Sequence, residues 1–219
     1  MTLPKPKAVI FDWDDTIVDN WPMSVIAFNA MLRHMGMEEW DNDTQIRRRG
    51  ASARDLLTGM FGNRWEEASQ VFYEHFVPMA EKNFRLHDRV EDVFKKLKDS
   101  GVFLAIVSNK RGAALRKDVE RSGFGHYFGA IVGAGDAAVD KPDPAPVIKA
   151  LEGTGIAPGP DVWFVGDSHI DMACGINSGC TPILIETKTP PEDLLLEYKP
   201  AERFGSHHGI MEWLNKHLS

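Results

Sequence analysis

The chain has 219 residues, enough for one large domain or for a core domain with a smaller one attached. Its 43% hydrophobic and 26% charged residues are typical of a globular protein, and its net charge of -7 argues against a generic binder of nucleic acid or of an acidic membrane surface. Two cysteines, Cys174 and Cys180, imply no disulfide framework and favour the cytoplasm, and no apolar run approaches the length of a membrane span.

The first predicted element is a strand that begins at Ala8 and ends on two acids, Asp12 and Asp14. Strand side chains alternate between faces, so these two carboxylates should lie on the same side of the strand's carboxyl end. Because two carboxylates held close together cannot both ionise freely, one would serve as a nucleophile or metal ligand and the other as a proton carrier. The alternative is an acidic turn that caps a helix beginning near Thr16.

Residues 18–85 carry only helical patterns, which predicts an inserted helical subdomain. Apolar spacings of three and four predict helices over about 21–35, 52–60 and 65–79, with Pro78 expected to bend or shorten the third. Asn20 is the expected cap of the first helix. The methionine and aromatic stripes of these helices are interpreted as core rather than as cofactor contacts.

Strands and helices alternate from Asp88 onward. A capping-box pattern at Asp88 and Glu91 opens a helix that Gly101 closes. Strands are predicted over 102–107, 130–132, 162–165 and 183–185, and helices over 111–122, 145–151 and 170–177, followed by a short helix and a terminal helix in residues 192–219. This alternation predicts a parallel sheet with helices on both faces.

Polar residues follow the predicted strands where each one ends. In open α/β sheets these ends meet in one crevice, which is where ligands bind. The residues in question are Asp12 and Asp14, Ser108 and Asn109, Lys141, and Asp167 with Asp171. Carboxylates without clustered thiols or histidines suit a hard cation such as Mg²⁺, and a metal with a lysine can neutralise a transferring phosphoryl group. For Asp167 and Asp171 the alternative is helix capping, but the convergence of four strand ends favours phosphoryl-transfer chemistry.

The four motifs resemble, in order, those of haloacid-dehalogenase (HAD) superfamily phosphatases of the phosphoglycolate-phosphatase-like group. They are Asp12-Trp13-Asp14-Asp15-Thr16, Val107-Ser108-Asn109, Lys141-Pro142-Asp143-Pro144, and Gly166-Asp167-Ser168 with Asp171. The resemblance implies an α/β fold: a Rossmann-like core with a central parallel sheet (residues 1–17 and 86–219) and an inserted helical, C1-type cap (residues 18–85).

The resemblance also implies catalytic roles. Asp12 would be the nucleophile, Asp14 the general acid and then the base that activates water, and Thr16 the residue that orients Asp14. Lys141 would neutralise charge between Asp12 and the phosphoryl group.

The remaining motif residues would hold the substrate and the metal. Ser108 and Asn109 would bind phosphoryl oxygens. Mg²⁺ would be bound by Asp12, by the backbone carbonyl of Asp14 and by Asp167, with Asp171 beside it or acting through water. Position 15 departs from the family because Asp replaces the usual Gly. Since Asp tolerates left-handed backbone geometry better than most residues, the fold is expected to survive.

The resemblance implies an enzyme that hydrolyses a small phosphomonoester, with phosphoglycolate first and a sugar phosphate second as the expected substrate. Arg49 and Arg54 on the cap would bind a substrate carboxylate or phosphate, or else belong to a solvated basic helix face. Two alternatives stay open: a phosphomutase of the beta-phosphoglucomutase type, which shares all four motifs, and a phospho-acceptor protein without turnover. The second has no reason to carry Asp14 or a helical cap.

Overall fold

The structure, a computed structural model, describes residues 3–48, 53–187 and 190–218. Its centre is a six-stranded sheet with the order β3-β2-β1-β4-β5-β6, in which every neighbouring pair is parallel. The strands are β1 (Ala8–Phe11), β2 (Phe103–Arg111), β3 (Ala130–Ala134), β4 (Val162–Gly166), β5 (Thr181–Ile185) and β6 (Glu202–Phe204). The predicted α/β fold is therefore confirmed.

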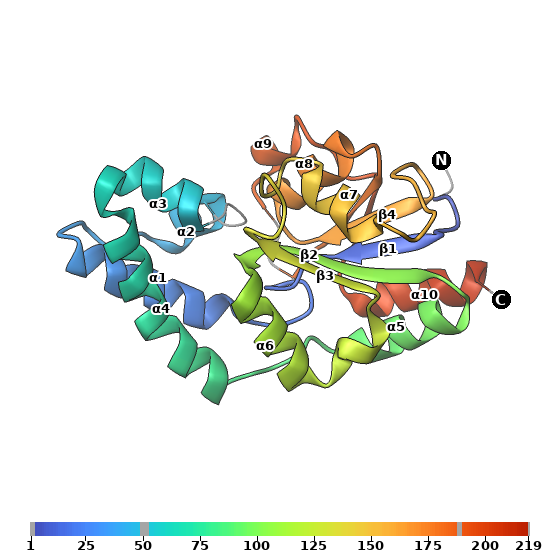
Figure 1. Cartoon of the computed structure of the whole chain (residues 1–219), viewed down its shortest axis with the longest axis horizontal. Helices are drawn as coiled ribbons and strands as arrows, with labels where there is room; N and C mark the ends of the chain where they lie inside the picture. Colours follow the sequence, from blue (N-terminus) through green and yellow to red (C-terminus); the bar gives the residue numbers. More distant parts are fainter. Residues whose placement is uncertain (1–2, 49–52, 188–189, 219) are drawn as a thin grey trace.

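Helices cover both faces of this sheet because its strands are apolar on both sides. The face that carries Val9, Phe11 and Leu104 packs against α5 (Val90–Asp99), α6 (Gly112–Ser122) and α10 (His207–His217). The opposite face, with Ala8, Ile10 and Phe164, packs against α7 (Ala145–Leu151) and α8 (His169–Asn177) (Figure 1). A short helix, α9 (Glu192–Leu195), follows the fifth strand. No helix in the described part of the chain is long and apolar enough to span a membrane.

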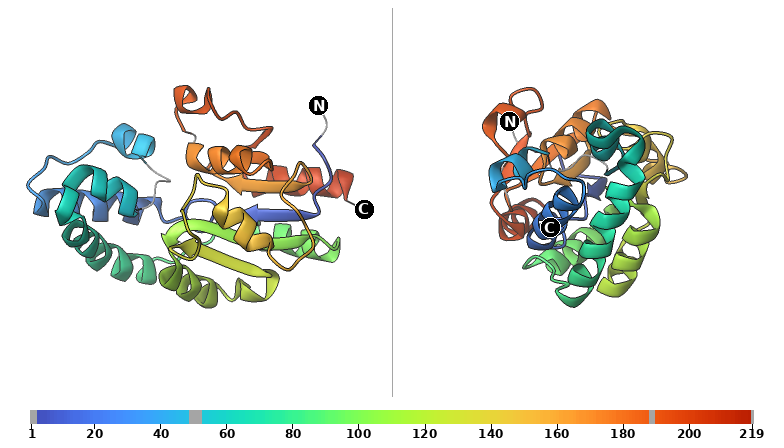
Figure 2. Two further views of the ribbon diagram at one scale, coloured as in Figure 1. Left: turned by 45° about the horizontal axis from the view of Figure 1, so that its top comes forward. Right: turned by 90° about the vertical axis from the view of Figure 1, so that its left-hand side faces the viewer.

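Four helices form the cap: α1 (Trp21–His34), α2 (Asn42–Arg48), α3 (Ala53–Phe61) and α4 (Trp65–Lys82). They lie beyond the carboxyl ends of the strands, at the opposite end of the molecule from both termini (Figures 1 and 2). Apolar side chains of α1, α3 and α4 give the cap its own core, which includes Met31, Leu32, Leu57 and Ala68.

The two connections between cap and sheet run side by side. Val18 and Leu86 form an antiparallel bridge. The Asp19 amide donates to the Arg85 carbonyl at 2.9 Å, and the His87 amide donates to the Ile17 carbonyl at 2.9 Å. The chain therefore enters and leaves the cap at one place, close to the proposed boundaries at residues 17/18 and 85/86.

Local expectations failed in places where tertiary contacts outweigh sequence pattern. Pro78 lies inside α4 and does not shorten it, because Phe76 and Ala80 on either side are anchored in the cap core. The capping box at Asp88 is wrong: α5 begins after Arg89, which has φ 63° and makes no side-chain cap. Asn20 occupies the N-cap position of α1, as predicted, but its side chain makes no capping hydrogen bond, and its side-chain amide donates to Asp14.

Candidate active site

The acidic residues meet where the winding of the sheet reverses. From β1 the chain proceeds through β2 to β3 on one side, and the later strands β4, β5 and β6 lie on the other side of β1. Asp12 follows β1 directly and Asp167 follows β4 directly, and the Asp12 amide donates to the Val165 carbonyl at 2.9 Å. Such a switch point leaves an open crevice beyond the strand ends, and this crevice holds the predicted site residues.

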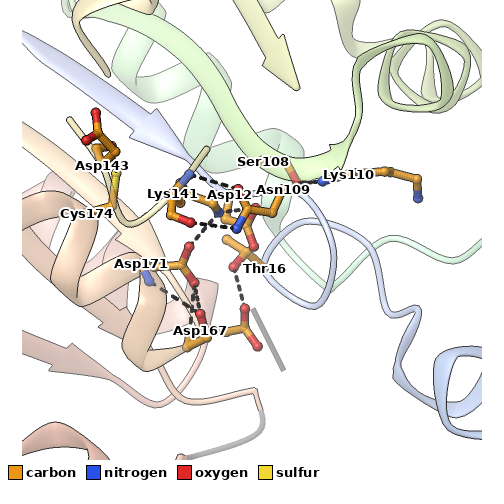
Figure 3. A network of polar contacts seen from close by, with 11 residues as sticks. Asp12, Thr16, Ser108, Asn109, Lys110, Lys141, Asp143, Asp167, Asp171 and Cys174 are labelled. Carbon is orange, nitrogen blue, oxygen red and sulfur yellow. Dashed lines mark hydrogen bonds and ion pairs between the residues drawn. The ribbon is translucent and has the colours of Figure 1, made fainter. Parts of the chain in front are cut away.

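Lys141 lies at the centre of the cluster. Its Nζ is 2.8 Å from Asp12 Oδ1 and 2.7 Å from Asp171 Oδ1, and all three residues are buried (Figure 3). Burial alone would lower the pKa of Lys141, but the two carboxylates more than offset this and raise it, so the lysine stays charged.

Burial disfavours the charged form of Asp12. Burial raises its pKa to about 7, with Asp171 and Asp167 adding to the rise and Lys141 opposing it. An anionic Asp12 thus depends on positive charge beside it. Lys141 supplies one such charge, and a bound cation would supply more.

Backbone and capping bonds hold Lys141 and Asp171 in place. The Asn109 side chain donates to the Lys141 carbonyl and accepts from its amide, both at 3.0 Å, which ties the loop after β3 to the end of β2. Ser168 and Asp171 form a reciprocal capping box at the start of α8, and the Ser168 hydroxyl donates to Asp171 Oδ2 at 2.6 Å. The capping interpretation of Asp171 and its place in the acidic cluster are therefore both correct.

Asp14 belongs to a second group of charges beside the first. Its Oδ1 accepts from the Asn20 side chain at 2.5 Å and from Lys110 Nζ at 2.9 Å. Lys110 also lies 2.6 Å from Asp118 Oδ2, and these two carboxylates raise its pKa although burial alone would lower it. Sequence reasoning missed Lys110, although it directly follows the Ser108-Asn109 motif at a strand end.

The other predicted residues divide into those at the site and those away from it. Ser108 and Asn109 line the cavity together with Asp12, Asp14, Lys141 and Asp167. Thr16 does not orient Asp14: it is fully buried, and its hydroxyl donates to Asp167 Oδ1 at 3.2 Å, because the chain turns toward β4 after the first motif. Arg54 is exposed and contacts the Trp65 ring instead of the cavity. Arg49 lies outside the described residues.

Asp15 shows why the fold tolerates it in place of Gly. Its φ is 62°, in the left-handed region, as expected from the sequence. Its carboxylate accepts a hydrogen bond from the backbone amide of Asn20 at 3.1 Å, and its backbone carbonyl accepts one from the Thr187 hydroxyl at 2.7 Å. The side chain therefore gains a local partner that a glycine would not have.

The donor set fits a hard divalent cation. Carboxylate oxygens of Asp12, Asp167 and Asp171 lie within 4.8 Å of one another, and all three residues are buried. Oxygen ligands of this kind match Mg²⁺, and a cation would counter both the burial and the neighbouring carboxylates that raise the Asp12 pKa. Both oxygens of Asp171 are engaged, by Lys141 and by Ser168, which leaves Asp12 and Asp167 as the better direct ligands.

The fold and site define an α/β protein with an acidic crevice under a helical cap. Residues 9–185 match the family model described as haloacid dehalogenase-like hydrolase, and the chain belongs to this family.

The chain is 29% identical over 174 residues to a phosphoglycolate phosphatase of Aquifex aeolicus, covering 79% of this chain and 81% of that one. It is 25% identical over 200 residues to the pyrophosphatase PpaX of Bacillus mycoides, covering 90% and 91%. The crystal structure of a HAD-superfamily hydrolase from Ehrlichia chaffeensis, 29% identical, covers 100% of both chains with a TM-score of 0.66.

Proposed function

We propose that this protein is a Mg²⁺-dependent phosphatase that hydrolyses a small phosphomonoester through an aspartyl phosphate on Asp12. The observation that carries the proposal is Lys141, buried between Asp12 and Asp171 at 2.8 and 2.7 Å, with Asp167 beside them. This geometry supports a mechanism that needs a nucleophilic carboxylate, a fixed cation and metal-binding oxygens close together. The family match and the relatives named as phosphatases support the same activity.

The metal, held by Asp12 and Asp167 with Asp171 beside it, would neutralise phosphoryl oxygens and orient the ester. Lys141 neutralises the same charge from the protein side, and Ser108 and Asn109 line the cavity where the phosphoryl oxygens would lie. An Asp12 oxygen attacks phosphorus and the bond to the ester oxygen breaks, while protonated Asp14 gives its proton to the leaving alcohol.

Asp14 then removes a proton from water, the water oxygen attacks phosphorus, and the bond to Asp12 breaks to release phosphate. Among the described residues, the partners of Asp14 hold its Oδ1, which leaves Oδ2 for both proton transfers. We also propose that the enzyme works in the cytoplasm, where the buried thiols Cys174 and Cys180 stay reduced.

The test is phosphate release from a panel of phosphomonoesters that includes phosphoglycolate and sugar phosphates, with Mg²⁺ or with excess chelator. Wild type should release phosphate only with the metal, and Asp12→Asn should be inactive. Asp99→Asn, the same change at an exposed carboxylate, serves as the matched control and should behave as wild type.

Two results would contradict the proposal. Release that survives in Asp12→Asn would exclude the aspartyl phosphate. A stable phosphoprotein without release would favour the phospho-acceptor alternative. A phosphomutase would instead convert one sugar phosphate into another, so the products of each panel member are separated as well as the phosphate counted.

A further inference from the structure

The cavity above the catalytic acids has two chemically different halves. It holds about 200 Å³, and its floor is the polar group of the sheet. Its cap side is lined by an aromatic wall, which we define as Trp21, Phe28, Trp40, Phe72, Tyr73 and Phe76. The sequence suggested that the cap's aromatic stripes are core alone. In the structure these residues serve both the cap core and the cavity lining.

Five members of the aromatic wall, namely Phe28, Trp40, Phe72, Tyr73 and Phe76, form a continuous set of ring contacts. Phe28 lies 4.8 Å from the Trp40 ring and 6.2 Å from Phe72, and Phe72 stacks on Phe76 at 5.4 Å with the planes 12° apart. Phe28, Trp40 and Phe72 are only partly buried although the cap packs around them, and they border the cavity. A surface of this kind gains free energy when an apolar group covers it, and aromatic groups gain most.

Positive charge on the described lining is already paired. Lys141 is held by Asp12 and Asp171, and Lys110 lies between Asp14 and Asp118 with its Nζ 5.1 Å from the Phe76 ring centre. Gln45 is a polar residue on the cap side. Its side-chain amide donates hydrogen bonds to Asn29 Oδ1 and to the Trp40 carbonyl. A second anionic group on the substrate would lose its water against aromatic rings, and no unpaired cation on the described part of the lining would replace that water, which is costly.

We propose, building on the function above, that the enzyme prefers phosphomonoesters whose alcohol carries an uncharged apolar group, best an aromatic ring, over esters with a second anion such as phosphoglycolate. The phosphoryl group lies on the acidic floor, and the ring covers the aromatic wall. The chemistry of the phosphoryl transfer is unchanged. The cap determines which alcohol it acts on.

The test compares two esters that differ only at the far end: 2-phenylethyl phosphate and 2-carboxyethyl phosphate. Both release a primary alcohol, so leaving-group reactivity is matched. We expect kcat/KM for the phenyl ester to exceed that for the carboxylate ester by about tenfold or more, the scale of discrimination that an apolar pocket gives. A ratio near or below one would overturn the inference.

Two cap variants locate the preference. Phe72→Leu should lower the phenyl-to-carboxylate ratio by roughly fivefold, the scale of one aromatic contact, whereas Phe61→Leu, the same change in the same cap core but away from the cavity, should leave it within about twofold. Because each ratio is taken within one protein preparation, partial unfolding of a variant does not alter it.

Leu56→Lys should move the preference toward the carboxylate ester, because Leu56 lines the cavity and a lysine there would supply the missing charge. Thr58→Lys adds the same charge at an exposed position on the same helix. It is the control and should leave the preference between the two esters unchanged. If Arg49→Gln instead removed a wild-type preference for the carboxylate ester, Arg49 would be the anion-binding residue and the inference would fail.

Failure of the inference is distinguishable from failure of the proposed function. Metal- and Asp12-dependent release with the carboxylate ester preferred would overturn the inference alone. No release from either ester or from the rest of the panel would overturn both.

Discussion

At the scale of single residues, the site depends on Lys141. It is 2% exposed and neutralises two buried carboxylates. Lys141→Met keeps the length of the side chain but leaves both carboxylates without their cation. We expect kcat to fall by about 10²–10³ or more, the cost of losing one electrostatic donor at a transition state. Stability should fall by about 3–5 kcal/mol, the cost of breaking a buried pair.

Phosphate release and urea unfolding measure the two effects. Lys149→Met, the same change at an exposed position on α7, is the control. A Lys141→Met enzyme that kept more than a tenth of its activity would show that charge at this position is dispensable.

In the proposed mechanism Lys110 would act through Asp14, as a positioning residue. Its Nζ holds Asp14 Oδ1 at 2.9 Å while Asp118 anchors it at 2.6 Å. In Lys110→Met the Asp14 carboxylate loses one of its two described donors, so proton transfer becomes poorly aligned. We expect kcat to fall about tenfold or more while KM changes little.

The separate changes in kcat and in KM, measured for the same substrate, decide the role of Lys110. A rise in KM with kcat unchanged would mean that Lys110 binds substrate instead. Lys117→Met, at an exposed position on α6 next to Asp118 in the chain, controls for the loss of a positive charge.

At the scale of elements, the turn from β4 into α8 requires glycine at position 166. A Cβ on Gly166 would lie 2.3 Å from the Cβ and Cγ of Asp171. Gly166→Ala would therefore displace the acid that pairs with Lys141. We expect a loss of about 1–3 kcal/mol, typical of overpacking, together with weaker metal binding.

Gly59→Ala is an informative control with the opposite sign. Gly59 lies inside α3, and a Cβ there would meet nothing within 4 Å. Alanine should stabilise the helix by about 0.5–1 kcal/mol. Thermal unfolding measures the stability of both variants. Equal changes in stability at the two sites would show that crowding against Asp171 does not cause the loss in Gly166→Ala.

Elements also show how far sequence reasoning extends. The ends of β1 and β4, which Asp12 and Asp167 follow, were predicted, because buried parallel strands are continuous apolar runs that stop at polar residues. The prediction for β2 was wrong at its end: the strand continues past residue 107 to Arg111, so Asn109 lies within it. Several short elements were missed for the opposite reason, among them α2 and β6. α2 is a seven-residue polar helix without apolar periodicity, and β6 is a three-residue edge strand whose pairing with β5 depends on long-range contact.

Contacts between residues that are far apart in the chain also could not be predicted from the sequence. Lys110 and Asp14 are 96 positions apart, and Thr16 and Asp167 are 151 apart, so no local pattern reveals that they meet. The resemblance implied that Thr16 orients Asp14, whereas in the structure the Thr16 hydroxyl donates to Asp167. Trp21, Phe28, Phe72 and Phe76 of the aromatic wall were visible in helical stripes, but Trp40 and Tyr73 were not, and only the packing of cap on sheet shows that the wall faces a cavity.

At the scale of the whole molecule, a buried histidine predicts how stability depends on pH. Burial, with His87 and His208 nearby, lowers the pKa of His207 from its ordinary 6.5 to about 3. His207 is 1% exposed, and among the described residues its Nε2 has no hydrogen-bond partner. Between pH 6.5 and 3 the unfolded chain therefore binds a proton that the folded chain does not, so stability falls as the pH falls, and the contribution is complete above pH 6.5.

At pH 5 the expected loss from this residue is about 2 kcal/mol relative to neutral pH. Unfolding in urea at several pH values measures it. His207→Leu should show a shallower dependence than wild type, whereas His75→Leu, at an exposed position on α4, should show the same one. If the stability of wild type and of His207→Leu changed equally with pH, His207 would not be the origin of the pH dependence.

The side-by-side connections at Val18 and Leu86 have a consequence for the history of the protein. An insertion whose two ends are adjacent can be lengthened, shortened or replaced without altering the register of the strands on which the acids lie. Selection can therefore act on the choice of alcohol and on the bond-breaking chemistry separately. A cap grafted from a relative at these two positions would carry its own substrate preference onto an unchanged catalytic floor.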